Sequence, residues 1–439
     1  MSSPLLDLLV CPACRGQLSE QAGLYSCTEC KAGYPTLGGV PCLLPQPDRW
    51  RASWRLQLSE LCRAAQETVT MFEKELRKPA LLPSTRLRLQ TQIALTKKTL
   101  AELVTIVEPA AGPNMDDPLL APRIDPLNTF HYLHRDWAET TENATALACV
   151  ERVLDDAPLR RLLVLGAGAG RLAYDLHRTR RATLTVALDI DPLVALVAQR
   201  MVSGGCIELT EARSNATEMT RFGVLRRLQA PAGPVERFHV LLANGLMPPL
   251  RAQMFDTVLT PWFIDVVPPD LRDFMSVLSQ VLVPGGRWLN YGPLLFPPSR
   301  PAAYRYAREE LAEIAQAAGF QITRETDELV RFAYSPLAAR GRLEHCIAFS
   351  AQKGVPKADA WLQIPHLPIP DFPGRAELCH ESAAFNAIIA LVDGRRSIND
   401  IAAQLGAGAG PDVNLGAMKD AVRLCLQTLH PTLEPACER

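Results

Sequence analysis

Two spacings of apolar residues divide the chain into regions of different structure. From residue 51 to about residue 108, apolar and charged positions recur at helical spacing, and the pattern breaks at Leu82-Pro83-Ser84. The break predicts two antiparallel helices. Further along, residues 162–165 and 184–188 form short apolar runs typical of buried strands, and amphipathic stretches separate such runs. This alternation predicts an α/β domain with a parallel sheet, interrupted by an insertion at roughly residues 203–237.

A glycine-dense turn follows the first of these strands, in the stretch LLVLGAGAGRLAYDL at residues 162–176. Gly166, Gly168 and Gly170 allow the backbone to pass close to a ligand, and the next helix offers unpaired N–H groups there. The dinucleotide pattern G-x-G-x-x-G would need a glycine where Arg171 stands, so NAD and FAD are disfavoured. The turn predicts a cradle for another nucleotide-like cofactor; its alternative interpretation is a tight strand-to-helix connection.

Polar residues around this turn indicate which cofactor it holds. Asp189 ends the second strand, where a carboxylate can accept both hydroxyls of a ribose, and Asn244 follows a later strand, where its amide can bind adenine. Arg135 and Arg171 are natural partners for a methionine carboxylate, with ordinary surface arginines as the alternative. The glycine turn, the second strand and Asp189 together predict S-adenosylmethionine, and Asn244, Arg135 and Arg171 are the residues expected to bind its adenine and its carboxylate.

Four cysteines near the N-terminus have the spacing of a metal site. Cys11 and Cys14 form one C-x-x-C pair, and Cys27 and Cys30 form a second one after twelve intervening residues. Each pair bends into a knuckle that presents two thiolates, and two knuckles complete the tetrahedral shell of a structural zinc. A redox dithiol or two disulfides are the alternatives. Cys42 lies outside the pattern and is expected to be a buried thiol.

Composition limits the partners of the protein. Its 439 residues, 48% of them hydrophobic, suffice for two to four domains. A formal net charge of -1 provides no general attraction to nucleic acid or to an anionic membrane. Because no apolar run approaches the roughly 20 residues of a membrane span, we expect a cytoplasmic protein without a membrane segment.

The strongest resemblance to a known family lies in the α/β region. The motifs HRDW, GAGAGRLAYDL, TPWFIDVV and VLVPGGRWLNYGPLLF resemble those of the carnosine N-methyltransferase family over roughly residues 130–353. The resemblance implies a Rossmann-like class I methyltransferase with a seven-stranded, mostly parallel sheet. It also implies that Asp265 holds the imidazole of the substrate, which would fix the tautomer that presents a nitrogen lone pair to the methyl group. The alternative is a turn acid before Pro268-Pro269.

Other residues of this region are candidates for the substrate side of the site. Trp262, Phe263 and Tyr291 belong to the same motifs, and Glu344 and His345 stand where the family has a tyrosine cluster. Pro297 takes the place of a family histidine. These differences leave the acceptor open between carnosine and another histidine derivative. For His345, a satisfied position at the end of a strand is the alternative.

The N-terminal region resembles a second family. Tyr34-Pro35 and Gly39-Val40-Pro41, which follow the cysteines, match the zinc-ribbon activator subunit of tRNA, rRNA and release-factor methyltransferases. That resemblance implies a module that binds and solubilises a methyltransferase.

The last 80 or so residues resemble the winged-helix peptide chaperone of the pyrroloquinoline-quinone pathway. The resemblance rests on a turn at Asp393-Gly394, an N-cap at Ser397 and a second helix around residues 418–429. It implies that a precursor peptide or a protein is presented to the enzyme. A packing or dimerisation module is the alternative.

We therefore expect four regions: a zinc ribbon at 1–48, a helical hairpin and linker at 49–120, a methyltransferase domain at 121–355 and a winged-helix-like domain at 356–439. The expected function is N-methylation of an imidazole or other nitrogen in a histidine-containing small molecule or peptide. The alternatives are an RNA or protein methyltransferase with a fused activator, a peptide-modifying methyltransferase of a natural-product pathway, and a non-catalytic partner. Nucleic acid is disfavoured because Thr260-Pro261-Trp262-Phe263 lacks the polar head that holds an exocyclic amine.

Overall fold

A computed structural model provides the structure of the protein. It describes residues 4–115, 126–138, 140–154, 156, 158–212, 216–337, 339, 341–356, 360–371, 382–409 and 414–433. The chain divides into two compact units, one of residues 1–266, 281–295 and 324–350, the other of residues 267–280, 296–323 and 351–439. The division groups the C-terminal residues with two segments of the expected methyltransferase domain, so the four expected regions stay a prediction. The expected domain start at residue 121 lies outside the described residues.

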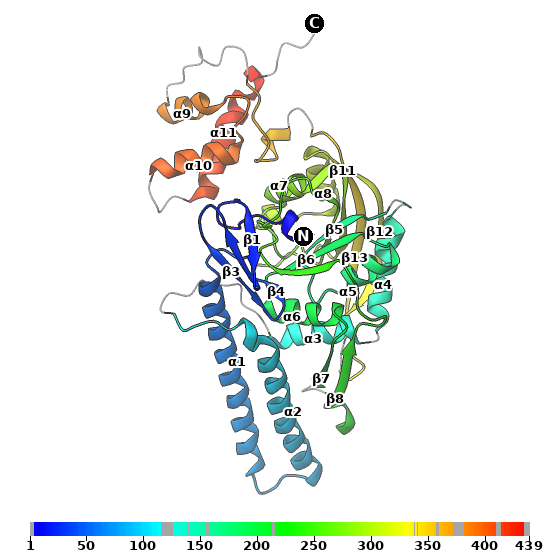
Figure 1. Cartoon of the computed structure of the whole chain (residues 1–439). Coiled ribbons are helices and arrows are strands. Elements are labelled where there is room, and N and C mark those ends of the chain that lie inside the picture. Colours follow the sequence, from blue (N-terminus) through cyan, green and yellow to red (C-terminus); the bar gives the residue numbers. More distant parts are fainter. Residues whose placement is uncertain are drawn as a thin grey trace. The chain divides into compact units, whose positions relative to one another are not determined.

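A seven-stranded sheet forms the core of the first unit (Figure 1). Its order is β12-β13-β11-β10-β5-β6-β9, and β11, β10, β5, β6 and β9 are parallel to their neighbours in that series. The strands are β5 (Arg161–Leu165), β6 (Leu184–Asp189), β9 (Phe238–Leu242), β10 (Phe255–Pro261), β11 (Leu282–Gly292), β12 (Phe320–Phe332) and β13 (Arg342–Lys353). This sheet confirms the seven-stranded, mostly parallel architecture.

Helices precede and alternate with these strands along the chain. They are α3 (Pro126–Trp137), α4 (Thr141–Val153), α5 (Arg171–Thr179), α6 (Pro192–Val202), α7 (Leu271–Val281) and α8 (Arg308–Ala317). The start of α6 is set by its sequence, because the Asp191 side chain accepts a hydrogen bond from the N–H of Leu193 at 2.8 Å and Pro192 occupies the first turn. Strand, glycine turn and helix therefore occur in the expected order.

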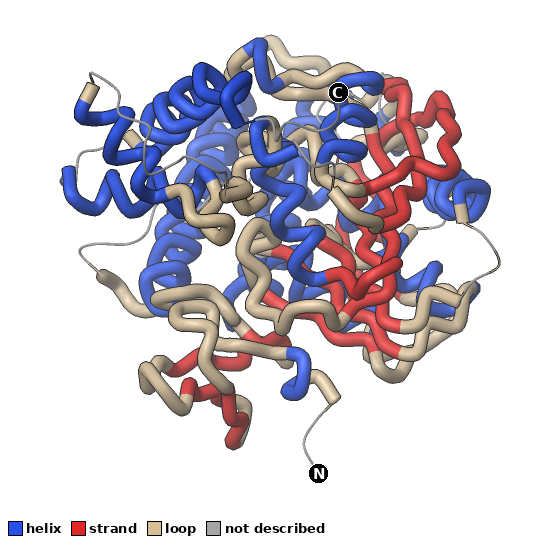
Figure 2. The backbone as a smooth tube through the Cα atoms, turned by 90° about the horizontal axis from the view of Figure 1, so that it is seen from above, coloured by secondary structure: helices blue, strands red, loops and turns tan. Residues whose placement is uncertain are grey.

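The N-terminal ribbon covers the edge of the sheet at β9. Its strands are β1 (Leu18–Gln21), β2 (Leu24–Cys27), β3 (Gly33–Leu37) and β4 (Val40–Pro41), which form a sheet of their own, the small red group beside the central strands in Figure 2. The N–H of Leu43 donates to Leu242 O of β9 at 2.8 Å, and Cys42, fully buried as expected, forms a parallel bridge with Leu242. The ribbon therefore pairs with an edge strand that would otherwise expose its backbone.

A second set of contacts joins the ribbon to the segment after β9. Arg15, in the first cysteine knuckle, donates from its two guanidinium nitrogens to Pro248 O at 2.7 Å and Leu250 O at 2.6 Å. The N–H of Val10 donates to Pro249 O at 3.0 Å. These bonds fix the segment that carries Asn244 near its start.

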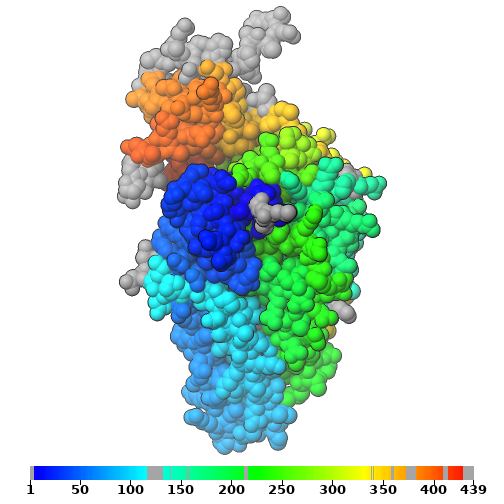
Figure 3. All heavy atoms as spheres, viewed as in Figure 1, coloured from blue at the N-terminus to red at the C-terminus, as the bar shows by residue number. Residues whose placement is uncertain are grey.

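The predicted helical hairpin and insertion are both present. Helices α1 (Pro47–Leu76) and α2 (Pro83–Val107) run antiparallel, and β7 (Cys206–Ala212) pairs with β8 (Gly223–Gln229) in a separate two-stranded sheet. The side chain of Glu102 on α2 accepts from the N–H of Thr210 on β7 at 2.9 Å, and Figure 3 shows the two elements side by side. The insertion therefore supports the hairpin.

The C-terminal residues form helices α9 (Ala383–Leu391), α10 (Ile398–Ala409) and α11 (Leu415–Leu433). Ser397 caps α10 as expected, since its Oγ accepts from the N–H of Asp400 at 3.2 Å and the Asp400 carboxylate accepts from the N–H of Ser397 at 2.9 Å. The winged-helix resemblance stays a prediction. Among the described residues, we find no helix that combines the length and the apolar character needed to cross a membrane.

Candidate functional site

The glycine turn has the backbone that a cofactor cradle needs. Gly166, Gly168 and Gly170 all have a positive φ, at +69°, +57° and +88°, a region that residues with a Cβ rarely adopt. Asp189 lies opposite the turn, because its carboxylate oxygens accept from the N–H of Gly168 at 2.8 Å and of Asp191 at 3.0 Å. Each oxygen keeps a second lone pair for a ribose hydroxyl. The predicted turn and acid are thus brought together.

One aromatic side chain, Phe263, and one amide side chain, Asn244, lie in the loops next to the turn. Phe263 is buried, and a Cβ at Gly166 or Gly245 would come within 2.5 Å or 3.0 Å of its ring. The ring therefore separates the two loops, and its predicted substrate contact stays a prediction. Asn244 accepts from the N–H of Leu246 at 2.9 Å through Oδ1, which leaves one lone pair and its amide hydrogens for adenine.

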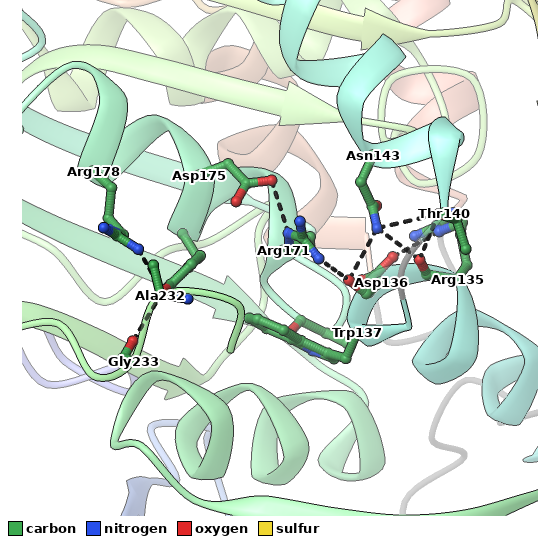
Figure 4. Close-up of polar contacts among 12 residues, drawn as sticks. Arg135, Asp136, Trp137, Thr140, Asn143, Arg171, Asp175, Arg178, Ala232 and Gly233 are labelled. Atoms are coloured by element: carbon green, nitrogen blue, oxygen red, sulfur yellow. Dashed lines mark hydrogen bonds and ion pairs between the residues drawn. The ribbon is translucent and has the colours of Figure 1, made fainter. Parts of the chain in front are cut away.

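The HRDW motif is tied to the glycine turn by its own polar groups (Figure 4). Trp137 donates from Nε1 to Ala169 O at 2.9 Å. Arg171 donates from Nη1 to Asp136 O at 2.9 Å and from Nε to the Asp175 carboxylate at 2.8 Å. Arg171 therefore braces the motif against α5, while its predicted contact with a methionine carboxylate stays a prediction.

Asp136 is an acid of this site that the sequence analysis missed. Its side chain is buried, and its Oδ2 is the atom nearest to a Cβ built on Gly168, at 3.9 Å. A carboxylate at this place suits the ammonium group of a methionine moiety. Its neighbour Arg135 donates from Nε to Asp136 Oδ1 at 2.6 Å.

Arg135 lies among aromatic rings. Its guanidinium carbon is 5.1 Å from the ring centroid of Trp262 and 5.0 Å from that of Tyr132. Burial disfavours its charge, but the carboxylates of Asp136 and Glu142 outweigh this effect and raise the pKa of Arg135. Arg135 is therefore a largely buried cation, and its partners in this structure are the carboxylates of Asp136 and Glu142.

Glu142, also missed from the sequence, is a buried acid at the start of α4. Its Oε1 is 4.0 Å from Arg135 Nε. Burial raises the pKa of Glu142 to about 7, although Arg135 and the backbone N–H groups of Ala333 and Tyr334 lower it. A perturbed acid of this kind is typical of functional sites. No local motif could have revealed Glu142, since its position depends on the packing of α4.

Trp262 holds a strained backbone at the end of β10. Its φ is +45°, and its N–H donates to Tyr291 O at 2.7 Å. Gly292 has a φ of +149°, which residues with a Cβ rarely adopt, and a Cβ there would lie 3.1 Å from the Trp262 backbone. The ring of Tyr291 meets that of Trp262 edge-on at 4.7 Å. The strain therefore positions two of the predicted aromatic residues.

Of the two candidates on β13, Glu344 and His345, Glu344 contacts Trp262. Its Oε2 accepts from Trp262 Nε1 at 3.4 Å, and its Oε1 lies 2.6 Å from Arg342. We call Arg135, Glu142, Trp262, Tyr291 and Glu344 the Trp262 cluster. His345 points to the other face of the strand, where it is exposed and 2.7 Å from Asp327, so the structure does not bring it to the cluster. Its predicted alternative, a strand-end histidine, fits this position.

Asp265 is buried three residues beyond Trp262. Its Oδ2 accepts from the N–H of Leu295 at 3.0 Å, which joins the segments that leave β10 and β11. These strands are neighbours and parallel, so both segments emerge at the carboxyl edge of the sheet, where ligands bind in such folds. The position fits the predicted role, and the hydrogen bond adds a structural one.

The four cysteines of the ribbon form a compact group. Their sulfur atoms all lie within 4.8 Å of one another, with 3.6 Å between Cys11 and Cys30 and 3.5 Å between Cys14 and Cys27. Tetrahedral zinc with bonds of about 2.3 Å places sulfur atoms about 3.8 Å apart, so the group fits this metal. The described cysteines are free thiols, and the predicted alternative of disulfides is not realised in this structure.

Fold and site together define a Rossmann-like protein with a cofactor cradle of the class I methyltransferase type. The family model described as "Carnosine N-methyltransferase" matches residues 222–339. This match spans β8 to β12 and includes Trp262, Asp265 and Tyr291.

Two individual relatives of the chain are carnosine N-methyltransferases. The chain is 27% identical to the carnosine N-methyltransferase unmet of Drosophila melanogaster, over 40% of this chain and 41% of that protein. It is 24% identical to the carnosine N-methyltransferase of Mus musculus, over 52% of this chain and 62% of that protein. The chain thus matches between two-fifths and three-fifths of the length of these relatives. Among solved structures, the 1,6-didemethyltoxoflavin-N1-methyltransferase of Burkholderia thailandensis is similar at 20% identity with a TM-score of 0.33, over 55% of this chain and 94% of that one.

Proposed function

We propose that the protein transfers a methyl group from S-adenosylmethionine to a nitrogen of a histidine-containing small molecule or peptide. One observation carries the proposal: Asp265 is a buried carboxylate at the carboxyl end of β10, and β10 is the parallel neighbour of β5, which ends in the glycine cradle. The similarity to carnosine N-methyltransferases supports the choice of acceptor.

The protein groups have separate tasks in this proposal. Asp189 and Asn244 would hold the ribose and the adenine, and Asp136 and Arg135 would hold the charged groups of the methionine moiety. When bound, S-adenosylmethionine supplies an electrophilic methyl group on a sulfonium. The residues of the chain do not change covalently, so their contribution is to orient the acceptor and to stabilise its charge.

Asp265 would act on the acceptor imidazole. In a neutral imidazole, only the ring nitrogen without a proton has a lone pair available for the methyl group. A carboxylate that accepts a hydrogen bond from the N–H of the other ring nitrogen favours the tautomer with that arrangement. As the methyl group arrives, the imidazole becomes imidazolium, and the negative charge of Asp265 stabilises it. The proton on the far nitrogen can then pass to the carboxylate or to water.

The terminal regions belong to the same proposal. We infer that the four cysteines bind a structural zinc and that the ribbon acts in cis as an activator-like module. The bonds of Arg15 to Pro248 O and Leu250 O support this, because they fix the segment that begins with the cofactor residue Asn244. A peptide-presenting role for the C-terminal helices rests on their resemblance alone.

Replacement of Asp265 by Asn tests the proposal. The amide oxygen can still accept from Leu295, so the fold should persist, whereas the charge is lost. We expect the turnover rate to fall by on the order of 10²-fold, with unchanged affinity for S-adenosylhomocysteine. Asp256→Asn is the matched control, because Asp256 lies on the same strand and its carboxylate accepts from the N–H of Arg161 at 3.2 Å. Near wild-type turnover of the Asp265 variant would show that this acid is only structural.

A further inference from the structure

Three aromatic rings surround the guanidinium group of Arg135. Besides the rings of Tyr132 and Trp262, the ring of Phe332 lies with its centroid 5.9 Å from the guanidinium carbon. Phe332 also contacts the other two rings, with its centroid 6.0 Å from that of Tyr132 and 5.9 Å from that of Trp262. We call these three rings the Arg135 cage. They come from α3, from the residue after β10 and from the last residue of β12, so the cage joins three elements of the first compact unit.

The cage restricts the guanidinium group without neutralising its charge. The face of an aromatic ring attracts a cation, and three rings leave a long side chain few conformations to adopt. The Arg135 side chain is 14% exposed, so it is not sealed from solvent. The arrangement therefore orients a cation that a ligand can still reach.

Arg135 uses one of its three guanidinium nitrogens in hydrogen bonding. Nε donates to Asp136 Oδ1 (Figure 4), whereas the two terminal nitrogens make no hydrogen bond to any residue that the structure describes. The other carboxylate oxygen of Asp136 borders the glycine turn, 3.9 Å from a Cβ built on Gly168. A free pair of guanidinium nitrogens next to such a carboxylate complements the carboxylate and the ammonium group of an α-amino acid.

Two strained residues hold rings of the cage in place. Trp262 has a φ of +45°, and Ala333, which directly follows Phe332, has the same value. Non-glycine residues at such φ values persist only where the surrounding structure holds them, and they are typical of ligand clamps. Glu142 contributes to this restraint, because its buried carboxylate interacts with the N–H groups of Ala333 and Tyr334. The chain therefore maintains strained backbone on two sides of the cage.

We propose that Phe332 is a positioning residue for the amino-acid end of the cofactor, because the Arg135 cage directs the terminal nitrogens of Arg135 to the carboxylate of the methionine moiety. A guanidinium held in this way can form two parallel hydrogen bonds to the carboxylate and loses little further freedom when the ligand binds. The inference rests on the proposed function, because the ligand is the S-adenosylmethionine named there. It adds the end of β12 to the residues on which cofactor affinity depends.

Binding of two ligands, measured by calorimetry, tests this role. S-adenosylhomocysteine carries the amino-acid end, whereas 5′-methylthioadenosine has the same adenine, ribose and sulfur without it. For the wild type, we expect a Kd about 10-fold or more lower for S-adenosylhomocysteine, since it alone offers charge-assisted hydrogen bonds to Arg135. Phe332→Leu keeps an apolar side chain but removes the ring. It should raise the Kd of S-adenosylhomocysteine about 5-fold or more and change that of 5′-methylthioadenosine by less than about 2-fold.

Two other variants show whether the ring itself matters. Tyr334→Leu is the matched control, because the Tyr334 ring lies two positions further along the chain, 5.3 Å from the guanidinium carbon of Arg331, and both affinities should stay at the wild-type values. Phe332→Tyr keeps a ring in the cage and should retain most of the affinity for S-adenosylhomocysteine. Phe332→Met replaces Phe332→Leu in the test if thermal melting shows that the Leu variant does not fold.

Arg135→Gln separates positioning from a general loss of structure. If the ring acts through the guanidinium group, Phe332→Leu should not weaken S-adenosylhomocysteine binding further when it is combined with Arg135→Gln. This inference alone would be overturned by additive losses in the double variant, by a wild type that binds the two ligands equally, or by a folded Phe332 variant without a ring that binds as wild type or loses affinity equally for both ligands. Failure of the wild type to bind S-adenosylhomocysteine would overturn the proposed function instead.

Discussion

Replacement of Glu142 by Gln tests whether the buried acid of the Trp262 cluster carries a proton near neutral pH. Burial raises the pKa of this carboxyl from an ordinary 4.5 to about 7. Between these values the folded protein holds a proton that the unfolded chain has released, so stability falls as pH rises through this window. Gln keeps the shape and can accept from the N–H groups of Ala333 and Tyr334, but it does not titrate.

The size of the effect follows from the two pKa values. Linkage gives a destabilisation by Glu142 of about 1 kcal/mol at pH 5 and about 3 kcal/mol at pH 8, since one pKa unit corresponds to about 1.4 kcal/mol. Glu142→Gln should therefore exceed the wild type in stability by an amount that grows with pH, with most of the gain between pH 5 and pH 7.

The assay is unfolding by urea, followed by tryptophan fluorescence at several pH values. Glu67→Gln serves as the control, because it removes an exposed carboxylate that pairs with Arg63 on α1. A stability difference between Glu142→Gln and wild type that is independent of pH, or that shrinks as pH rises, would contradict a raised pKa of Glu142. It would show that Glu142 is ionised throughout and that Arg135 outweighs its burial.

Three other substitutions test separate parts of the structure. Cys27→Ser should release zinc and lower the thermal stability of the ribbon, and zinc retained at one per chain by elemental analysis would contradict the proposed site. Gly168→Ala places a Cβ at a φ of +57° and should weaken the binding of S-adenosylhomocysteine, measured by calorimetry, by about 10-fold or more. Gly233→Ala is the control, because Gly233 has a φ of +80° with open space around it, and it should not weaken this binding. Equal losses of affinity in both variants would point to backbone strain alone. Arg15→Ala removes two hydrogen bonds to backbone carbonyls and should lower stability by about 1–2 kcal/mol in urea unfolding, whereas an unchanged midpoint would show that the ribbon docks without them.

The sequence was most informative where local rules decide the structure. Each strand of the central sheet that the apolar runs indicated is present, and Gly166, Gly168 and Gly170 form a turn between β5 and α5 as expected. Asp189 lies at the end of β6, as the apolar run before it predicted. These features depend on a few neighbouring residues, so a single sequence is enough to predict them.

Features set by packing between distant segments were harder to predict. Asp136 and Glu142 are brought to the site by the packing of α3 against the glycine turn and of α4 against the residues that follow β12. His345 was a candidate because it stands, with Glu344, where the carnosine N-methyltransferase family has a tyrosine cluster. Neighbouring residues of a strand point to opposite faces, however, and of these two Glu344 faces Trp262. The bond of Arg15 to the segment after β9 spans more than 230 positions and has no local trace.

The mass of the acceptor after reaction tests the proposed imidazole N-methylation most directly. Purified protein is incubated with S-adenosylmethionine that carries a deuterated methyl group and with histidine, carnosine or a short histidine peptide, and the products are fragmented by mass spectrometry. We predict that one labelled methyl group appears on the imidazole of at least one acceptor, and that Asp265→Asn forms on the order of 10²-fold less product in the same time. A label found only on oxygen or carbon, or no transfer to any of these acceptors by a protein that binds S-adenosylhomocysteine, would contradict the proposed imidazole N-methylation.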